Sequence, residues 1–181
     1  EAGVNTYNTS IGTVSRDAYL NQIKDYQVLY EYAQENSEGF FRMEKFNRKT
    51  KNDGTLAGYP TASVFSSTLN SSVANFYESV GMRHSKVYYA FDGATAFTSA
   101  MLSVNYMYSD TENNAKNETS EYYERLYTPV AESGELTLYK CNYTLPFGFV
   151  VPEDFEMPNI KAKDPIKLQN EMVQALGIKD A

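Results

Sequence analysis

Amphipathic helical segments alternate along this chain with short strand-like runs, and glycine or proline separates most of them. Apolar residues recur with a helical period in four segments, which cover residues 15–34, 70–81, 94–101 and 164–177. Runs typical of strands occur at residues 40–46, 104–108, 123–130, 136–141 and 147–151. Strands and helices mixed in this order predict an α+β fold, with a mixed sheet of about five strands packed by three to four helices.

Two of the predicted helices have capping residues at both ends. Asn70 can accept hydrogen bonds from the free amides at the start of one helix, and Gly81 can end it in the left-handed conformation. Asp164 and Pro165 begin the last helix, because the carboxylate accepts from free amides while proline pre-sets the first turn, and Gly177 ends it. The helix at residues 70–81 is predicted to bury one face, formed by Val73, Phe76, Tyr77 and Val80.

Turn residues divide the strand-like runs. The Asn-Asp-Gly sequence at residues 52–54 predicts a tight turn, because Asp and Gly tolerate the left-handed backbone. Residues 131–134 join two strand runs, which predicts a hairpin. Pro146 and Pro152 flank the run 147–151, so this strand is expected to be short and near a sheet edge, where a missing amide donor is tolerated.

The length of 181 residues fits one domain with a tail. Residues 1–14 are rich in Asn, Thr, Gly and Ser and are predicted to form an extended N-terminal arm or linker, followed by a single α+β domain over residues 15–181. No apolar run reaches the length of about 18 residues that a membrane span needs. The sequence begins at Glu1 without Met or a signal peptide, so we expect a piece of a longer protein.

The charge balance argues against nucleic acid as a partner. The formal net charge is -7 at pH 7, whereas binding to a phosphate backbone relies on clustered Lys and Arg. The most basic stretch, residues 42–51, also contains Glu44 and is expected to be a solvated strand end, with binding of an anionic polymer as the alternative. Arg42 and Glu44 alternate on the predicted strand, so Glu44 is predicted to form a cross-strand or solvent-facing ion pair.

Few side chains of the types that catalysis needs are present. A hydrolytic triad would have to include His84, the one histidine, which is expected in a solvated loop. Cys141 lies in an apolar run and is predicted to be a buried thiol. One His and one Cys do not make a zinc site, and no phosphate-binding glycine loop occurs. We therefore predict no catalytic, cofactor-binding or metal-binding residue, while a pair among the 23 carboxylates leaves a secreted hydrolase as a third alternative.

Aromatic residues give the one binding mode that the composition favours. The chain has 16 Tyr and 10 Phe but no Trp, and a tyrosine ring packs while its hydroxyl stays available for a partner. Aromatic faces next to serine hydroxyls suit carbohydrate contact, and ordinary packing and capping is the alternative for the same side chains. The candidate carbohydrate-contact residues are Tyr59, Phe65, Ser66, Ser67, Tyr88 and Tyr89.

Several short stretches, in the same order along the chain, resemble the YfhO family of multi-spanning bacterial membrane proteins. The motifs are GFFRME at 39–44, NDG at 52–54 with GY at 58–59, VFSST at 64–68, SAMLSVNYMY at 99–108, LYKCN at 138–142, LPFGF at 145–149 and DP at 164–165 with QN at 169–170. The resemblance extends over roughly residues 15–177.

The resemblance implies a fragment of an integral membrane glycosyltransferase of the GT-C type in Gram-positive bacteria. Such an enzyme uses a polyprenyl-phosphate-linked sugar donor outside the cell, and the implied acceptor is a wall polymer such as lipoteichoic acid. Its acidic catalytic residues would lie in a loop between early membrane helices, which this chain does not contain. The chain would then be a domain on the extracellular face of the membrane that shapes or covers the acceptor side.

The implied partners are the membrane-embedded remainder of the same protein and, at the binding surface, a cell-wall glycan or polyprenyl-linked sugar. The main alternative is a non-catalytic ectodomain that supports the membrane part or binds a protein partner. Exposed Tyr and Phe in one cleft would favour ligand contact, whereas a flat apolar patch would favour docking.

Overall fold

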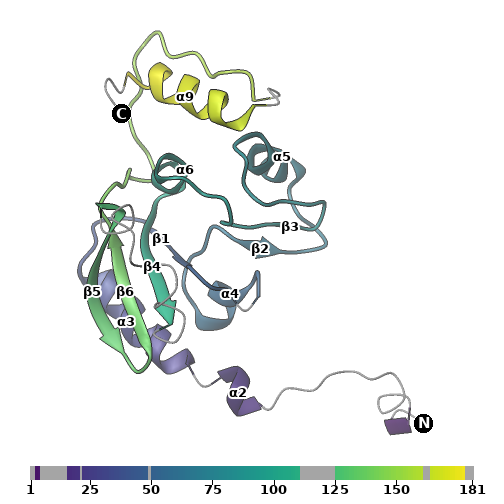
Figure 1. Ribbon diagram of the computed structural model, residues 1–181, viewed down its shortest axis with the longest axis vertical. Helices are drawn as coiled ribbons and strands as arrows, with labels where there is room; N and C mark the ends of the chain where they lie inside the picture. The colour runs from purple at the N-terminus through teal and green to yellow at the C-terminus, as the bar shows by residue number, and fades with distance from the viewer. Residues whose placement is uncertain are drawn as a thin grey trace.

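The computed structural model describes residues 3–4, 16–20, 22–48, 50–110, 125–160 and 164–177. The predicted α+β fold is confirmed (Figure 1). The predicted arm at residues 1–14 lies outside the described residues except at positions 3 and 4. The elements follow in the order α2 (Arg16–Leu20), α3 (Ile23–Glu35), β1 (Arg42–Lys45), α4 (Asp53–Ala57), β2 (Val64–Phe65), α5 (Ser71–Ser79), β3 (Tyr88–Tyr89), α6 (Ala96–Met101), β4 (Val104–Asp110), β5 (Tyr127–Ser133), β6 (Leu136–Cys141) and α9 (Pro165–Ala175).

The main sheet is mixed and has four strands in the order β1-β4-β6-β5. β1 runs parallel to β4, whereas β6 pairs antiparallel with both β4 and β5. Parallel neighbours need a long crossover, and here the crossover contains α4, α5 and α6. Within the crossover β2 and β3 form a separate antiparallel ribbon, which the sequence patterns did not predict.

The predicted fifth strand at residues 147–151 is wrong. These residues form neither helix nor strand, and Val150 is 98% exposed. Pro146 and Pro152 have no amide donor, so a run of five residues between them offers few hydrogen bonds to a sheet edge. Residues 154–160, which follow this run, also contain no helix or strand.

The predicted tight turn at residues 52–54 is also wrong, because Asp53 and Gly54 begin the helix α4. The Asp53 Oδ1 accepts hydrogen bonds from the backbone N–H and the hydroxyl of Thr50, both at 2.7 Å. These bonds fix the loop before the helix, which propensity alone does not reveal. The left-handed residue is instead Gly58, with φ of 83°, which ends α4 at a conformation that costs glycine little.

The hairpin of β5 and β6 is confirmed, and β6 has the predicted bounds, whereas β5 begins and ends later than the predicted run 123–130. β5 continues to Ser133 and the turn begins at Gly134, which has φ of 56°. β4 continues to Asp110, two residues beyond the predicted run 104–108, and residues 111–124 lie outside the described residues. The strand extends this far because Asp110 pairs with Lys45 of β1, at 3.0 Å between Oδ2 and Nζ.

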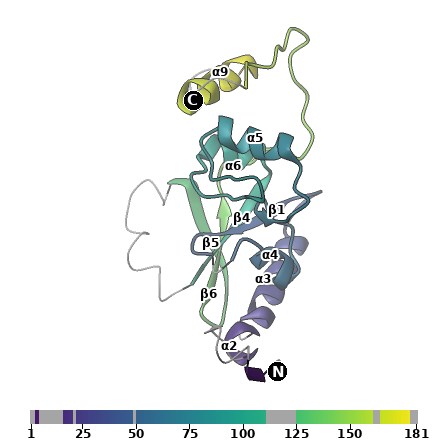
Figure 2. The same cartoon turned by 90° about the vertical axis from the view of Figure 1, so that its right-hand side faces the viewer.

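The helix α3 covers one face of the main sheet, as Figure 2 shows. The helical period predicted for residues 15–34 appears as two helices, α2 and α3, in the structure. We call the side chains buried between α3, α4 and the sheet the α3 core. Its members are Tyr26, Leu29, Ala33, Phe41, Met43, Ala57, Tyr59, Tyr106, Tyr108, Leu136 and Leu138.

The helix α9 packs on α5 and α6 at the end of the molecule away from α3 (Figures 1 and 2). Gln169 anchors it, since its Nε2 donates to the carbonyl oxygen of Val80 at 2.8 Å and its Oε1 accepts from the Thr95 hydroxyl at 2.6 Å. On its inner face the side chains of Leu168 and Met172 are buried. The predicted last helix therefore exists and closes a second core.

The predicted caps are confirmed. The Asn70 Oδ1 accepts from the Ser72 amide at 2.9 Å, and the Asp164 Oδ1 accepts from the Lys167 amide at 3.0 Å. The glycines after α5 and α9, Gly81 and Gly177, have φ of 79° and 73°. Local sequence signals were thus sufficient to place both of these helices.

Candidate functional site

An open pocket lies where α5 faces β1 and the ribbon of β2 and β3, and we call it the α5 pocket. Its volume of about 380 Å³ falls within the range of roughly 300–1,000 Å³ that is typical of small-molecule sites. Four of its lining residues come from the first two turns of α5. The lining residues are Arg42, Thr61, Ala62, Ser72, Val73, Phe76, Tyr77, Tyr89 and Leu102.

One wall of the α5 pocket is aromatic. The ring centroids of Tyr77 and Tyr89 are 4.7 Å apart with planes tilted by 40°, and the ring of Phe76 is 6.3 Å from that of Tyr77. Tyr77 is buried and donates its hydroxyl hydrogen to the carbonyl oxygen of Ala62. Burial raises the pKa of Tyr77 well above its usual value, so the hydroxyl stays protonated. Tyr89 is half-buried and presents an open ring to the pocket.

Arg42 supplies the charge of the pocket. Its Nη1 donates to the carbonyl oxygen of Leu102 at 2.7 Å. Its guanidinium carbon lies 5.0 Å from the ring centroid of Phe40 and 5.5 Å from that of Phe147, within cation–π range. These contacts hold the guanidinium in one place without neutralising it.

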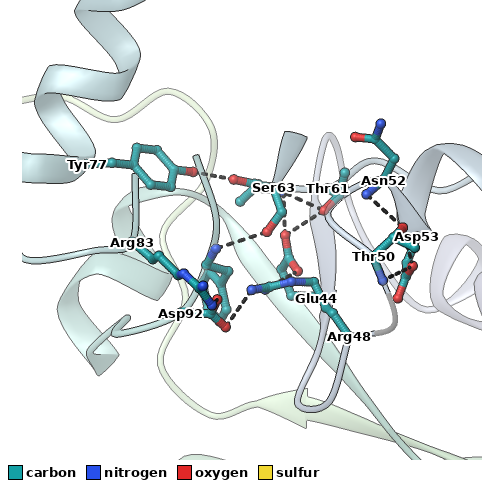
Figure 3. A network of polar contacts seen from close by, with 12 residues as sticks. Glu44, Arg48, Thr50, Asn52, Asp53, Thr61, Ser63, Tyr77, Arg83 and Asp92 are labelled. Atoms are coloured by element: carbon teal, nitrogen blue, oxygen red, sulfur yellow. Dashed lines mark hydrogen bonds and ion pairs between the residues drawn. The ribbon is translucent and has the colours of Figure 1, made fainter. Parts of the chain in front are cut away.

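The buried carboxylate of Glu44 holds the backbone of the pocket residues Thr61 and Ala62 in position (Figure 3). Glu44 is 1% exposed. Its Oε1 accepts from the Thr61 hydroxyl at 2.5 Å and from the Ala62 amide at 2.9 Å. Its Oε2 lies 3.4 Å from Nη1 of Arg48, whose Nη2 lies 2.5 Å from Oδ1 of Asp92. Because a buried charge needs such partners, Glu44 fixes the floor residues Thr61 and Ala62.

Glu44 forms an ion pair as predicted, but the pair is buried and joins residues four apart in sequence, and the prediction of a solvated basic stretch is wrong. Glu44 neither faces solvent nor pairs with Arg42, and Lys45 is 2% exposed. The Lys45 Nζ pairs with Asp110 and donates to the Tyr26 hydroxyl at 2.5 Å. Alternation along β1 cannot reveal this, because partners that are remote in sequence cover both faces of the strand.

The predicted carbohydrate contacts are spread over two places. Tyr59 is 5% exposed and packs in the α3 core, with its ring 5.1 Å from that of Tyr108, so we leave it out of the candidate site. Tyr89 lines the α5 pocket. Tyr88, its neighbour in β3, instead lies below Lys51, whose Nζ is 4.3 Å from the ring centroid.

The remaining three candidates lie on or just after β2. Phe65 is 53% exposed, and the hydroxyl of Ser66 bonds to that of Thr68 at 3.2 Å. Ser67 is exposed. None of these three lines the α5 pocket.

Sequence reasoning missed most of the pocket. The strand pattern placed Arg42 on the face opposite Phe41 and Met43, but it did not indicate a pocket there. The α5 stripe of Phe76 and Tyr77 was predicted as buried packing, and only the gap between α5 and the ribbon turns part of that stripe into a wall. The helical period was the available signal, and it does not separate core from pocket.

The other reactive side chains are engaged elsewhere. The His84 Nε2 lies 3.7 Å from a Glu78 carboxylate oxygen, and its Nδ1 lies 3.1 Å from the carbonyl oxygen of Met82. Cys141 is buried as predicted, and burial raises the pKa of its thiol to about 12, which suppresses the thiolate. In the described ranges no group of three or more His, Cys, Asp or Glu side chains could hold a metal ion.

The fold and the α5 pocket define an α+β domain with an open, aromatic-walled recess that carries one guanidinium. The model of the family described as bacterial membrane protein YfhO matches residues 1–181, so the chain belongs to this family of membrane proteins. The resemblance carried by the short motifs is thereby confirmed. No curated protein and no solved structure matches the chain. Within the described ranges, every helix is too short or too polar to cross a bilayer.

Proposed function

We propose that the chain is an extracellular domain of a multi-spanning bacterial membrane glycosyltransferase, and that its α5 pocket holds part of the acceptor. The whole enzyme transfers a sugar from a polyprenyl-phosphate donor to a cell-wall polymer such as lipoteichoic acid. Membership of a bacterial membrane-protein family supports the membrane part of this proposal. The observation that carries the binding role is the α5 pocket itself.

The composition of the pocket suits a polyhydroxylated ligand. The rings of Tyr89 and Phe76 offer flat apolar faces, and the hydroxyl of Ser72 and the guanidinium of Arg42 offer polar contacts beside them. Ligand sites typically combine mostly apolar walls with a few polar groups that fix orientation. A volume of about 380 Å³ accommodates a short segment of a polymer rather than a whole chain.

The chemical step is assigned to the membrane-embedded remainder of the protein. In that step an acceptor hydroxyl attacks the anomeric carbon, the sugar–phosphate bond breaks with its electron pair on the phosphate, and the hydroxyl proton passes to a carboxylate. Glu44, the carboxylate beneath the α5 pocket, is 1% exposed and fully engaged with Thr61, Ala62 and Arg48, so it serves as a support and not as that base.

A docking role is the second candidate function, and one observation favours it. The segment between β6 and α9 exposes large apolar side chains, among them Phe147 at 64% and Val150 at 98%, and Ile166 at the start of α9 is 74% exposed. Such side chains suit contact with another part of a membrane protein. In this alternative the domain supports the membrane part or a partner and binds no glycan.

The two functions are separated by calorimetric titration of the purified chain with teichoic-acid fragments. We expect saturable binding, and roughly tenfold weaker binding for Tyr89→Ala, because removal of a ring that stacks on the ligand removes about 1–3 kcal/mol. The matched control is Phe65→Ala, which removes an exposed ring from the neighbouring strand of the same ribbon and outside the pocket. Absence of binding at millimolar ligand contradicts the proposal and leaves the docking role.

A further inference from the structure

The described cations of this domain differ in whether a carboxylate lies beside them. Lys45, Arg48 and Arg83 each have a carboxylate oxygen within 4.0 Å. Arg42 has no such partner in the part of the chain that the structure describes, although the sequence contains 23 acidic residues against 16 basic ones. A half-buried guanidinium without a counter-ion is an uncommon feature in an acidic protein.

The guanidinium of Arg42 is held in one position by its neighbours. An arginine side chain has five N–H donors in a planar fork. Among the described residues one donor is used, by the carbonyl oxygen of Leu102, while the rings of Phe40 and Phe147 lie beside the group. Its other donors form no hydrogen bond with another described residue, and the contacts that do form restrict the side chain, which reduces the entropy lost on binding.

The surroundings of Arg42 favour a negative ligand over a positive or neutral one. None of the described residues that line the α5 pocket is acidic. Ser72 and Val73, in the first turn of the nine-residue helix α5, also line it, and the start of a helix carries a partial positive charge. Glu44 lies near the floor, but its charge is opposed by Arg48 and enclosed by Thr61 and Ala62.

We propose that the α5 pocket binds a phosphate group of its glycan ligand, with Arg42 donating paired hydrogen bonds to two phosphate oxygens and the Tyr89 ring covering the adjacent sugar or polyol. This inference rests on the proposed function, in which both the acceptor polymer and the polyprenyl-linked donor contain phosphate. Arginine matches the geometry of a phosphate or carboxylate with two parallel N–H bonds, and such charge-assisted bonds are about twice as strong as neutral ones. Arg42 is thus a specificity-determining residue for an anionic ligand.

The test is calorimetric titration of the whole 181-residue chain with three probes. The first is a glycerol-phosphate oligomer, the second is a synthetic oligomer of equal length in which neutral methylphosphonate linkages replace the phosphodiesters, and the third is a short-chain, water-soluble prenyl-phosphate sugar. We expect the phosphate-containing oligomer to bind roughly tenfold or more tightly than the neutral one, since a hydrogen-bonded charge contributes about 1.5–3 kcal/mol. The third probe separates the two sources of phosphate.

Three variants make the test specific. Arg42→Gln should weaken binding of the phosphate oligomer roughly tenfold to a hundredfold and leave binding of the neutral oligomer unchanged. Arg42→Lys keeps the charge but loses the fork, and should lie between the two. Arg83→Gln is the control, because Arg83 is exposed, pairs with Asp92 at 3.6 Å and does not line the pocket. Raised salt should weaken phosphate binding by the wild-type chain more than by Arg42→Gln.

Each outcome supports or overturns the inference. Equal affinity of the wild-type chain for the phosphate and neutral oligomers overturns it while the proposed function stands. Unchanged phosphate affinity in Arg42→Gln also overturns it, provided that thermal unfolding shows a folded variant. If no probe binds, the proposed function itself fails. Binding of the prenyl-phosphate sugar alone keeps the phosphate site and assigns the pocket to the donor.

Discussion

Tyrosine side chains occupy two regions of this molecule that differ in how completely they are covered. In the α3 core Tyr108 is 0% exposed, and the rings of Tyr26 and Tyr59 each lie 5.1 Å from its ring. At the α5 pocket Tyr77 is buried, but Tyr89, 4.7 Å from it, is half-buried and faces the recess. The 13-residue α3 closes its side of the sheet, whereas the nine-residue α5 leaves a gap. The same residue type therefore forms part of a core or the wall of an open pocket according to the length and position of the covering helix.

Tyr108→Ala is expected to have the largest effect on stability, and it tests the difference between the α3 core and the α5 pocket. Removing a fully buried aromatic ring leaves a cavity among Tyr26, Tyr59 and α3, so the free energy of unfolding should fall by about 3–5 kcal/mol. Urea unfolding monitored by circular dichroism measures the loss. Tyr89→Ala is the comparison, and it should cost about 1 kcal/mol because its ring is only partly buried and lines an open pocket. Similar losses for both variants would mean that the two regions are equally closed.

A smaller effect is expected for Glu44→Gln, which weakens the support of the α5 pocket. The amide keeps the shape of the side chain but loses the charge that opposes Arg48 at 3.4 Å. Stability should fall by about 1.5–3 kcal/mol, the usual contribution of a hydrogen bond to a charged group. The variant should also bind the glycan ligand more weakly, because Thr61 and Ala62 lose a fixed partner.

Glu78→Gln is the control for this prediction. Glu78 lies on α5, is exposed and does not line the pocket. If Glu44→Gln and Glu78→Gln unfold at the same urea concentration, the role assigned to Glu44 is wrong.

Alkaline pH should destabilise both regions through their buried hydroxyls. Burial raises the pKa of Tyr26, Tyr77 and Tyr108 well above the usual value of about 10. The unfolded chain therefore loses these protons first, so the stability they contribute is complete below pH of about 10 and falls as pH rises further, by about 1.4 kcal/mol per pH unit for each hydroxyl. Urea unfolding at several alkaline pH values measures the slope, and Tyr108→Phe should reduce it by one hydroxyl's share. A slope that Tyr108→Phe leaves unchanged would contradict the assignment.

The smallest change in stability is expected for Phe147→Ala, at the rim of the α5 pocket. Phe147→Ala removes one of the two rings beside the Arg42 guanidinium. Because Phe147 is 64% exposed, the free energy of unfolding should change by less than about 0.5 kcal/mol. Affinity for the glycerol-phosphate oligomer should still fall roughly twofold to fivefold, the value of an exposed cation–π contact. Val150→Ala, in the same segment and 98% exposed, should leave affinity unchanged.

Prediction from sequence succeeded where neighbours along the chain supply the structure. The caps at Asn70 and Asp164 work through amides two or three residues away, and both were identified correctly. The two-strand hairpin of β5 and β6 is likewise local. The failures at residues 52–54 and 147–151 occurred where a side-chain bond or a pair of prolines outweighed propensity.

The candidate site was less predictable than the fold. Of the six residues proposed from composition, Tyr89 lines the pocket and Tyr59 packs in the α3 core. Adjacent tyrosines in β3 point to different surroundings, so Tyr88 meets Lys51 while Tyr89 meets Tyr77. A run of aromatic residues therefore does not indicate which rings line a pocket and which pack in the core.

Period, capping and motif order in the amino-acid sequence were enough to establish the α+β class, the helices α5 and α9 and membership of a bacterial membrane-protein family. These signals act between residues that are close along the chain, or they are written directly in its motifs. Tertiary structure alone decided that Lys45 pairs with Asp110 while Arg42, three residues earlier, lines a pocket and has no carboxylate partner among the described residues. The physical reason is that a side chain's burial and counter-ion come from segments distant in sequence, which only the packed chain brings together.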